Sequence, residues 1–503
     1  MKILLVVPTF RYNQGGAPLS FSDFPAGYGY LAAALKRAGH EVSALNPNNI
    51  RGYPSAPIML QDVLSKSLRS VQPDLVAVGG LATDFNWLRD AIAITRSVLP
   101  RSKIVLGGQI VSNDPVDVPA LLKPDYAIIG EAEEGLVALA NSGGRSMPAI
   151  IRSEPIHNLD SLPFPDYEPF GIREMLDQHS GDTRLLYRYP RLNARPWTIV
   201  ASRSCPFTCT FCVHGRRDIP YRARSIGNIM AEIGESYAKY KFNILILLDE
   251  LFAVKNDRLR EFSEAVLQGR EEQGWDFDWM FQTHASARFD LGTLQLAKRA
   301  GCFFFSYGLE SASSVVLQSM RKKIKIEQVI EAMELAHQAE IGFGANLIFG
   351  DTAETKATWA ESLTFWLTHG QEDFIFLSTL MPYPGSDVFE ACLTKGMFAD
   401  KRHYYEHIDE SAVNMTSMAE DDFRDLLNLT SYLEKTWLFV QGAFDVKLER
   451  IEAKHYKVIA TCPYCRADSV YHQELADMSK PFFIGTGCTK CNRRIKIMLR
   501  FSD

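Results

Sequence analysis

The first part of the chain alternates short apolar runs with amphipathic stretches of helical period. The apolar runs are bounded by glycine or polar residues and have the length of buried strands. This alternation predicts βαβ units and an α/β fold with a doubly wound parallel sheet over residues 1–140. The expected strands are Ile3–Val7, Leu75–Gly80, Ile104–Gly108 and Tyr126–Gly130, and the expected helices are Tyr28–Ala38 and Trp87–Val98.

Several of these expected strands end in glycines or in a polar loop. The ends are Gly79–Gly80, Gly107–Gly108 and Gly130–Glu131. Open parallel sheets bind ligands at the carboxyl ends of their strands. The pattern therefore predicts a cofactor crevice along this edge of the sheet.

The alternation returns in residues 196–390, after a stretch rich in turn residues. Residues 141–195 contain Asn141-Ser-Gly-Gly-Arg145 together with Pro163 and Pro165, so we expect an extended, mostly non-helical linker. The strands beyond it predict a partial (β/α)6 barrel. They are Trp197–Ser202, Ile244–Leu248, Trp279–Thr283, Phe303–Gly308, Ala345–Phe349 and Phe374–Leu380.

Two further regions follow the expected barrel. Residues 391–455 are expected to be a helical extension, because Glu420–Ile451 has helical periodicity. Residues 456–503 form a short cysteine-rich domain. A chain of this length fits about three domains of roughly 100 to 200 residues each.

Composition restricts the class of protein. Of the 503 residues, 46% are hydrophobic and 23% are charged, which is typical of folded globular proteins. The formal net charge of -6 gives no electrostatic reason to expect a nucleic-acid partner. The N-terminal apolar run is too short for a signal peptide, and no stretch reaches the roughly 20 apolar residues that cross a bilayer. We expect a cytoplasmic protein with reduced thiols.

Cys205, Cys209 and Cys212 form a CxxxCxxC motif directly after the expected strand Trp197–Ser202. Three thiolates can ligate three irons of a 4Fe-4S cube and leave the fourth iron open to another ligand. The spacing alone also fits a zinc site completed by His214, because three thiolates and an imidazole make a closed tetrahedron.

Further motifs follow in order, each near the end of an expected strand. They are Leu248-Asp249-Glu250, Gly308-Leu-Glu310-Ser311, Gly350-Asp-Thr-Ala-Glu354-Thr and Pro382-Tyr383-Pro384-Gly385-Ser386. Together with the cysteines, they resemble the radical S-adenosylmethionine (SAM) superfamily, in which SAM occupies the open iron. Asp351 and Ala353 depart from the family's usual turn. The resemblance implies SAM contacts at Phe211, Glu250, Glu310 and Ser311, and an external electron donor such as flavodoxin or ferredoxin.

The N-terminal region resembles the cobalamin-binding Rossmann-like domain that many radical SAM proteins carry. The resemblance rests on Pro25-Ala-Gly27-Tyr-Gly29-Tyr30, on Gly39-His40-Glu-Val and on the glycine-rich strand ends. Backbone N–H groups there can hold a phosphate, and small residues admit a corrin. The resemblance implies cobalamin contacts at Ala82, Thr83, Gly107, Gly108, Gly130 and Glu131.

The DxHxxG pattern that supplies a histidine ligand to cobalt is absent from this region. We therefore expect cobalamin to bind without such a ligand. The alternative is a domain that has kept the fold and lost the cofactor, since fold alone does not fix function.

Cys462-Pro-Tyr-Cys465 and Cys488-Thr-Lys-Cys491 form a pair of CxxC motifs. Four thiolates favour a closed, structural zinc site in a small zinc-ribbon-like domain. The alternative is a rubredoxin-like iron site or an iron–sulfur cluster, because four thiolates also suit iron.

Three residues near the ends of expected barrel strands are candidates for catalysis or substrate contact: His284, Arg288 and Tyr383. The resemblance to cobalamin-dependent (class B) radical SAM enzymes implies a methyltransferase that acts on an unactivated carbon of a small molecule, through a 5'-deoxyadenosyl radical and methylcobalamin. Cyclases and ring-rearranging enzymes use the same cofactors, so that chemistry is the alternative. A non-catalytic corrinoid or redox sensor is the alternative from another class. A methylthiotransferase is disfavoured, because no cysteine precedes Cys205.

Overall fold

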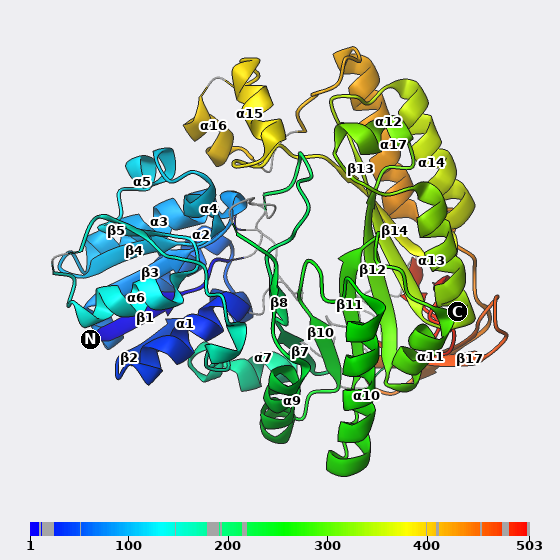
Figure 1. The fold of residues 1–503 in the computed structure, drawn as a ribbon, viewed down its shortest axis with the longest axis horizontal. Helices are drawn as coiled ribbons and strands as arrows, with labels where there is room; N and C mark the ends of the chain where they lie inside the picture. Colours follow the sequence, from blue (N-terminus) through cyan, green and yellow to red (C-terminus); the bar gives the residue numbers. More distant parts are fainter. Residues whose placement is uncertain are drawn as a thin grey trace. The chain divides into compact units, whose positions relative to one another are not determined.

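The computed structural model describes residues 1–9, 12, 25–50, 52–145, 147–178, 191, 194–213, 219–398, 400–408, 412–452, 455–474 and 482–499. The chain divides into two compact units, whose elements are labelled in Figure 1. The first unit comprises Met1–Gln178, Phe211–Arg222 and Pro382–Ser411. The second comprises His179–Thr210, Ala223–Met381 and Ala412–Asp503. Segments far apart in the sequence therefore build each unit.

The first unit is built on a parallel sheet with the strand order β2-β1-β3-β4-β5-β6. Its strands are β1 (Lys2–Val6), β2 (Glu41–Leu45), β3 (Leu75–Gly79), β4 (Lys103–Gly107), β5 (Tyr126–Ile129) and β6 (Ile150–Arg152). Its helices in this region are α1 (Ala26–Arg37), α2 (Ala56–Val71), α3 (Phe85–Val98), α4 (Gln109–Asn113), α5 (Asp117–Leu122), α6 (Ala132–Asn141) and α7 (Ile172–Gln178). Because the chain goes from β1 to β2 on one side and then to β3 on the other, the topological switch point lies at the carboxyl ends of β1 and β3.

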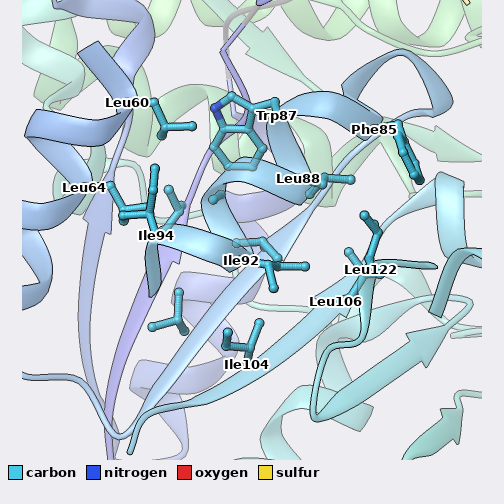
Figure 2. Close-up of a cluster of buried hydrophobic side chains, with 14 of the residues drawn as sticks. Leu60, Leu64, Phe85, Trp87, Leu88, Ile92, Ile94, Ile104, Leu106 and Leu122 are labelled. Atoms are coloured by element: carbon cyan, nitrogen blue, oxygen red, sulfur yellow. The ribbon is translucent and has the colours of Figure 1, made fainter. Parts of the chain in front are cut away.

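Both faces of this sheet are buried. Successive strand residues point to opposite faces, so Leu4 and Val6 pack in one hydrophobic cluster while Ile3 and Leu5 pack in another. Figure 2 shows the first cluster, in which side chains of α3 lie over Ile104 and Leu106 of β4. This double burial explains why the strands are continuous hydrophobic runs, and it confirms the doubly wound arrangement.

The expected linker contributes to the first sheet. Residues Ile150–Arg152 form β6, which pairs in parallel with β5, and the segment also contains the short helix α7. Further along this segment, Tyr167 packs against α1, where a Cβ on Gly29 would lie 2.5 Å from its ring. That close approach explains the glycine in the Pro25-Ala-Gly27-Tyr-Gly29 motif.

The second unit is built on another parallel sheet, with the order β14-β13-β12-β11-β10-β7. Its strands are β7 (Pro196–Ile199), β10 (Ile244–Leu247), β11 (Asp278–His284), β12 (Cys302–Glu310), β13 (Gly342–Phe349) and β14 (Phe374–Thr379). The intervening helices are α9 (Ile226–Tyr240), α10 (Asn256–Gln273), α11 (Leu291–Arg299), α12 (Ser314–Ser319), α13 (Ile326–Gln338) and α14 (Lys356–His369), and the short strands β8 (Ser202–Arg203) and β9 (Arg222–Ala223) flank the first cysteine motif. This order confirms the predicted (β/α)6 arrangement.

The helix predicted over Glu420–Ile451 is only half right. Helix α17 (Glu420–Thr436) ends at Trp437, which adopts a left-handed conformation with φ 50°. The later part, Phe444–Arg450, is strand β15, because its apolar residues alternate with period two and it pairs antiparallel with β16 (His455–Thr461). The cysteine-rich region adds β17 (Asp468–Glu474), β18 (Phe482–Gly487) and β19 (Arg494–Leu499), while α15 (Asp387–Thr394) and α16 (Lys401–Glu406) belong to the first unit.

None of the helices in the described ranges is both long enough and apolar enough to span a membrane.

Candidate functional site

The loop that carries the first cysteine motif is anchored at its base by Asp249. This carboxylate follows β10 and accepts hydrogen bonds from the Ser202 hydroxyl (2.7 Å), the Ser202 N–H and the Ala201 N–H (3.2 Å). Burial raises the pKa of Asp249 to about 7, against the opposing effect of these hydrogen bonds. Glu250, which was expected to contact SAM, is the next residue and is only partly buried. Asp249 therefore fixes the strand from which the cysteine loop departs.

The cysteine loop is held at two more points within the second unit. The Phe207 ring stacks on the His284 ring, with centroids 3.7 Å apart and planes at 14°. The Thr210 N–H donates to the Met320 carbonyl oxygen at 3.1 Å. The thiols of Cys205, Cys209 and Cys212 are all partly exposed. Cys205 and Cys209 fall in the second unit, whereas Phe211 and Cys212 fall in the segment grouped with the first.

His284 is a buried imidazole at the carboxyl end of β11. Its Nδ1 accepts from the Ser286 N–H at 3.1 Å and lies 2.9 Å from the Ser286 hydroxyl, so the ring proton is on Nε2. Nε2 is buried and has no hydrogen-bond partner among the described residues. Burial, and then the positive charge of Lys322, lower the pKa of His284 to about 3. The side chain is thus a neutral hydrogen-bond donor whose Nε2–H has no acceptor among the described residues.

Glu310 and Ser311 end β12 in different surroundings. Glu310 has a left-handed φ of 71° and receives the Lys322 ammonium at 2.8 Å, with both side chains nearly buried. Gly308 leaves room for this pair, because a Cβ there would lie 2.7 Å from Lys322 Nζ. The Ser311 hydroxyl lies 3.1 Å from the Ser362 hydroxyl on α14. Lys322 therefore holds Glu310 at the strand end, and the Ser311 hydroxyl lies within hydrogen-bond distance of α14.

The turn after β13 is closed by Glu354. Its carboxylate accepts from the Gly350 N–H at 3.2 Å and from the Thr358 hydroxyl at 2.9 Å. Burial raises the pKa of Glu354 to about 7. Gly350 has a φ of 105°, a conformation that favours glycine. This bonding gives a structural reason for the Gly350 to Glu354 motif.

A cavity of about 270 Å³ lies on the inner side of the second sheet. Its walls come from β10 to β14 and include Gln282, Ser306 and Asn346. Gly487, Cys488 and Asn492, here called the ribbon floor, close the cavity near the amino ends of the strands. The Asn492 side-chain amide donates to the Glu340 carbonyl before β13 at 2.9 Å, and the Arg494 N–H donates to the Glu372 carbonyl before β14 at 2.7 Å.

None of the three predicted substrate-contact residues is among the described residues that line this cavity. Arg288 is exposed and borders a small hollow with Phe305, Tyr307 and Glu331, next to α13 rather than on the inner side of the sheet. Tyr383 is 37% exposed and lies in the segment Pro382–Ser411 of the first unit. Among the three candidates, the structure thus places His284 beside the cysteine loop.

Glycines shape the carboxyl edge of the first sheet. A Cβ on Gly79 would lie 2.8 Å from the Gly107 carbonyl carbon, and one on Gly108 would lie 2.6 Å from the Gly80 nitrogen. By contrast, a Cβ on Gly107 would meet no atom of the described residues within 4 Å. Ala82 and Thr83 form a short 3-10 turn after β3, at the topological switch point. The loops are therefore tightly joined to one another while space is open beyond β4, which fits a bulky planar ligand.

Glu131 has a different role from the glycines of this edge. Its carboxylate receives both terminal nitrogens of Arg222, at 2.7 and 3.1 Å, and the Ile156 N–H at 2.8 Å. Gly130, with φ 92°, receives support from the Ser112 hydroxyl, which accepts from its N–H at 3.0 Å. The Glu131 side chain therefore tethers Arg222, in the segment after the cysteine motif, to the first sheet.

The second cysteine group is assembled for a single metal ion. The ligand atoms of Cys462, Cys465, Cys488 and Cys491 all lie within 4.8 Å of one another. The Cys462–Cys491 sulfurs are 3.8 Å apart and the Cys465–Cys488 sulfurs 3.6 Å apart. Four thiols so close fit a tetrahedral ion with no open position.

Several residues of the site were not singled out from the sequence. Asp249 was passed over in favour of its neighbour Glu250, and Lys322 carried no motif at all. Phe207 lies inside the cysteine motif as an unremarkable spacer residue. The polar residues of the cavity wall were also not singled out. Their signal in the sequence is a break in the apolar pattern, because Gln282, Ser306 and Asn346 are polar residues inside otherwise apolar strands.

Comparison with known proteins gives two matched families. Residues 21–140 match the B12 binding domain, and residues 199–365 match the radical SAM superfamily.

Two curated relatives cover most of the chain. An anaerobic magnesium-protoporphyrin IX monomethyl ester cyclase from Cereibacter sphaeroides is 27% identical over 78% of this chain and 63% of its own length. A hopanoid C-3 methylase from Methylococcus capsulatus is 24% identical over 72% of this chain and 67% of its own length. The chain thus spans less than two thirds of the cyclase.

Among solved structures, the radical SAM methyltransferase TsrM from Kitasatospora setae, with tryptophan and a SAM analogue bound, superposes with a TM-score of 0.59. The superposition covers 78% of this chain and 76% of TsrM at 16% identity. At that identity the likeness shows a shared fold.

Proposed function

The chain belongs to the branch of the radical SAM superfamily that carries an N-terminal B12-binding domain, and from this premise we propose that it is a cobalamin-dependent methyltransferase acting on an unactivated carbon of a small molecule. The observation that carries the proposal is the anchoring of the CxxxCxxC loop at the carboxyl end of the barrel sheet. Asp249 holds its base, and Phe207 rests on a neutral His284 whose Nε2 has no partner among the described residues.

Cys205, Cys209 and Cys212 would hold a 4Fe-4S cluster, and Phe211, Glu250, Glu310 and Ser311 would contact SAM. When bound, the cluster and SAM supply a hydrogen-abstracting radical and the corrinoid supplies the methyl group. His284 would donate its Nε2 proton to an acceptor on SAM or substrate, which satisfies its orphaned N–H. Burial lowers the pKa of that imidazole and keeps it neutral, and the Lys322 ammonium, held on Glu310, acts in the same direction.

Ala82, Thr83, Gly107, Gly108 and Gly130 would line the cobalamin site. The open space beyond Gly107 fits the ligand, and Gly79 and Gly80 lock the loops on either side of it. Glu131 would act indirectly, by holding Arg222. For the four C-terminal cysteines we propose zinc, because their mutual distances suit one tetrahedral ion. The cluster would need an external one-electron donor such as flavodoxin or ferredoxin.

The cyclase relative supports a second candidate function, an oxidative cyclisation with the same cofactors, since it is 27% identical over most of the chain. The mass of the product distinguishes the two reactions. Methyl transfer adds one CH2 to the substrate, whereas cyclisation adds none.

The test of the enzyme is anaerobic reconstitution with iron and sulfide, followed by reduction and addition of SAM. We expect 5'-deoxyadenosine to form in the wild type and in Cys392→Ala, whose cysteine lies outside both motifs. Cys209→Ala should retain less iron and lose the product by more than about a hundredfold, because a cluster with two protein thiolates is poorly held. Failure of the wild type to form 5'-deoxyadenosine would support a non-catalytic sensor instead.

The cobalamin site is tested by a glycine that has free space. Gly107→Leu should keep the fold, because its Cβ meets no atom within 4 Å in the part of the chain that the structure describes, while the longer side chain fills the space proposed for the corrin. The matched control is Gly227→Leu on α9, whose Cβ is equally free of neighbours. Equilibrium binding of hydroxocobalamin should fall in the first variant and stay unchanged in the second. Equal binding by both would contradict this placement.

A further inference from the structure

The cavity of the second unit has a lining whose chemistry is specific. Along β11 to β14 its inner side carries two kinds of side chain. Phe304, Phe374 and Phe376 supply aromatic surface, and Gln282, Ser306 and Asn346 supply amide and hydroxyl groups. The rings of Phe304 and Phe374 meet edge to face, with centroids 5.7 Å apart.

The three polar side chains are neighbours on the sheet. Gln282 and Ser306 are direct partners across β11 and β12, and Ser306 is paired with Gly344, two residues before Asn346. Direct partners on one face of a sheet lie about 5 Å apart and diagonal ones about 7 to 8 Å apart. One small ligand can therefore reach all three.

None of these three side chains hydrogen bonds to another residue in the described ranges, and each has access to the cavity. A polar side chain on the inner side of a barrel loses its hydration, at a cost in free energy, when a ligand covers it without forming a hydrogen bond. A ligand that seats here must therefore bring its own donors or acceptors to this point.

Fixed positive charge is missing from the lining, which includes no lysine, arginine or histidine among the described residues. Asp249 and Cys488 are its ionisable members, and both have other partners. The Asp249 oxygens accept from Ser202 and Ala201, and the Cys488 thiol lies among the four ribbon cysteines. The Arg494 guanidinium lies outside the lining, 3.8 Å from the Trp437 ring and 6.0 Å from the Phe376 ring, so an anionic group in the cavity would be desolvated without a cation in hydrogen-bond contact.

The ribbon floor forms one end of the cavity. A Cβ on Gly342 at the start of β13 would lie 2.8 Å from the Asn492 carbonyl oxygen, so the ribbon fits closely against the strand. Lys298 ties the two together by donating to the carbonyl oxygens of Glu340 (2.6 Å) and Lys490 (3.2 Å). Cys488 is at once a ribbon thiol and part of the cavity lining.

We propose that this cavity receives one end of the substrate, an aromatic or otherwise apolar body with an uncharged hydrogen-bonding group that Gln282, Ser306 and Asn346 select, and that the ribbon floor sets its depth. The inference rests on the proposed function, because it assumes that the reacting carbon lies at the cysteine-loop end of the cavity. It assigns to the substrate a neutral hydroxyl, carbonyl or amide at the buried end, and excludes a carboxylate or phosphate there.

The test compares two probes of one shape, 2-naphthol and 2-naphthoate, by equilibrium dialysis against the reconstituted holoprotein. We expect 2-naphthol to bind at least about tenfold more tightly, because the carboxylate would lose its hydration without a cation. Gln282→Leu and Asn346→Leu should each weaken 2-naphthol binding by about fivefold, the loss of roughly one hydrogen bond. The control is Gln268→Leu, an exposed glutamine of α10, which should bind both probes like the wild type.

The floor is tested through Cys465, a ribbon cysteine that does not line the cavity. Cys465→Ser should lower ribbon metal content and 2-naphthol affinity together, while iron content and cobalamin binding show that the rest of the chain has folded. The proposal is overturned by equal or tighter binding of 2-naphthoate, by absence of binding of both probes, or by an unchanged preference in both leucine variants. The 5'-deoxyadenosine assay on the same preparations reports separately on the proposed function.

Discussion

The two six-stranded parallel sheets of this chain differ in how far their faces are buried. Every residue of β3 in the first sheet is buried, whereas β14 in the second alternates buried residues with exposed ones such as Phe376. The first sheet has helices on both faces, so its chemistry is confined to the loops at its carboxyl edge. One side of the second sheet lines a cavity, so side chains from the interiors of its strands are accessible there as well.

The difference shows where each kind of cofactor or substrate can be held. A ligand at the carboxyl edge of the first sheet meets glycines and backbone N–H groups, because most side chains of the central strands β1, β3 and β4 are buried. A ligand of the second sheet meets the side chains that alternate along the strands. Substitutions in each sheet test this contrast.

The largest expected effect is that of a polar residue placed in each sheet. Val78 in β3 is 4% exposed and Phe376 in β14 is 37% exposed. Val78→Asn should destabilise its unit by about 3 to 4 kcal/mol, from lost apolar burial and an unpaired amide, and Phe376→Asn by about 1 kcal/mol or less. Hydrogen–deuterium exchange of peptides from each sheet in increasing urea measures both. Similar losses in the two variants would remove the contrast.

A buried carboxyl group sharpens the comparison at the carboxyl end of the second sheet. Burial raises the pKa of Glu354 to about 7 in the folded protein, from its ordinary value of 4.5. The folded state therefore binds the proton more tightly, and this group stabilises it fully below about pH 4.5 and progressively less up to about pH 7. Up to about 3 kcal/mol is lost across that interval.

Glu354→Gln should remove that part of the pH dependence, because the amide stays neutral and can still accept from the Gly350 N–H. Urea midpoints of wild type and variant between pH 4.5 and 8 measure it. The two curves should diverge as the pH rises, with the variant the more stable. Parallel curves would show that Glu354 titrates in the folded protein as it does when unfolded.

The smallest expected effect concerns the inner side of the second sheet. Gln282→Leu removes an exposed amide that has no hydrogen-bond partner among the described residues, so stability should change by less than about 0.5 kcal/mol. Thermal unfolding at matched metal content checks this. A large loss of stability would mean that the Gln282 amide stabilises the sheet. Its presence on the inner side would then be explained without a ligand.

Most strands could be predicted from the sequence, because parallel sheets produce apolar runs with clear ends. The limits of β10, β13 and β14 differ from expectation by a few residues, which is the usual uncertainty at element ends. Several elements were missed or misassigned, among them β2 and α2, which the sequence analysis did not predict. β6 was missed because it has only three residues and lies at a sheet edge. The end of α17 was misplaced because Trp437 adopts a left-handed conformation, which is not expected of a tryptophan.

The cysteines of the candidate site could be predicted, because their spacing along the sequence indicates metal ligands. Residues whose hydrogen-bond partners are backbone atoms were harder to predict. Nothing in the sequence tells whether Asp249 or Glu250 turns inward, since adjacent carboxylates differ only in the face they occupy. The seating of the ribbon against the barrel was likewise invisible, because Asn492, Lys298 and Arg494 bond to carbonyl oxygens that every residue possesses.

The ribbon floor also bears on the order of events during synthesis. Asn492 bonds to a carbonyl 152 residues earlier, and Lys298 to one 192 residues later. The strands of the second sheet leave the ribosome long before the segment that closes them, so the nascent barrel exposes Phe304 and Phe374 for many seconds at about 5 to 20 residues per second. That apolar surface stays exposed until the ribbon segment has been made and can pack against the strands.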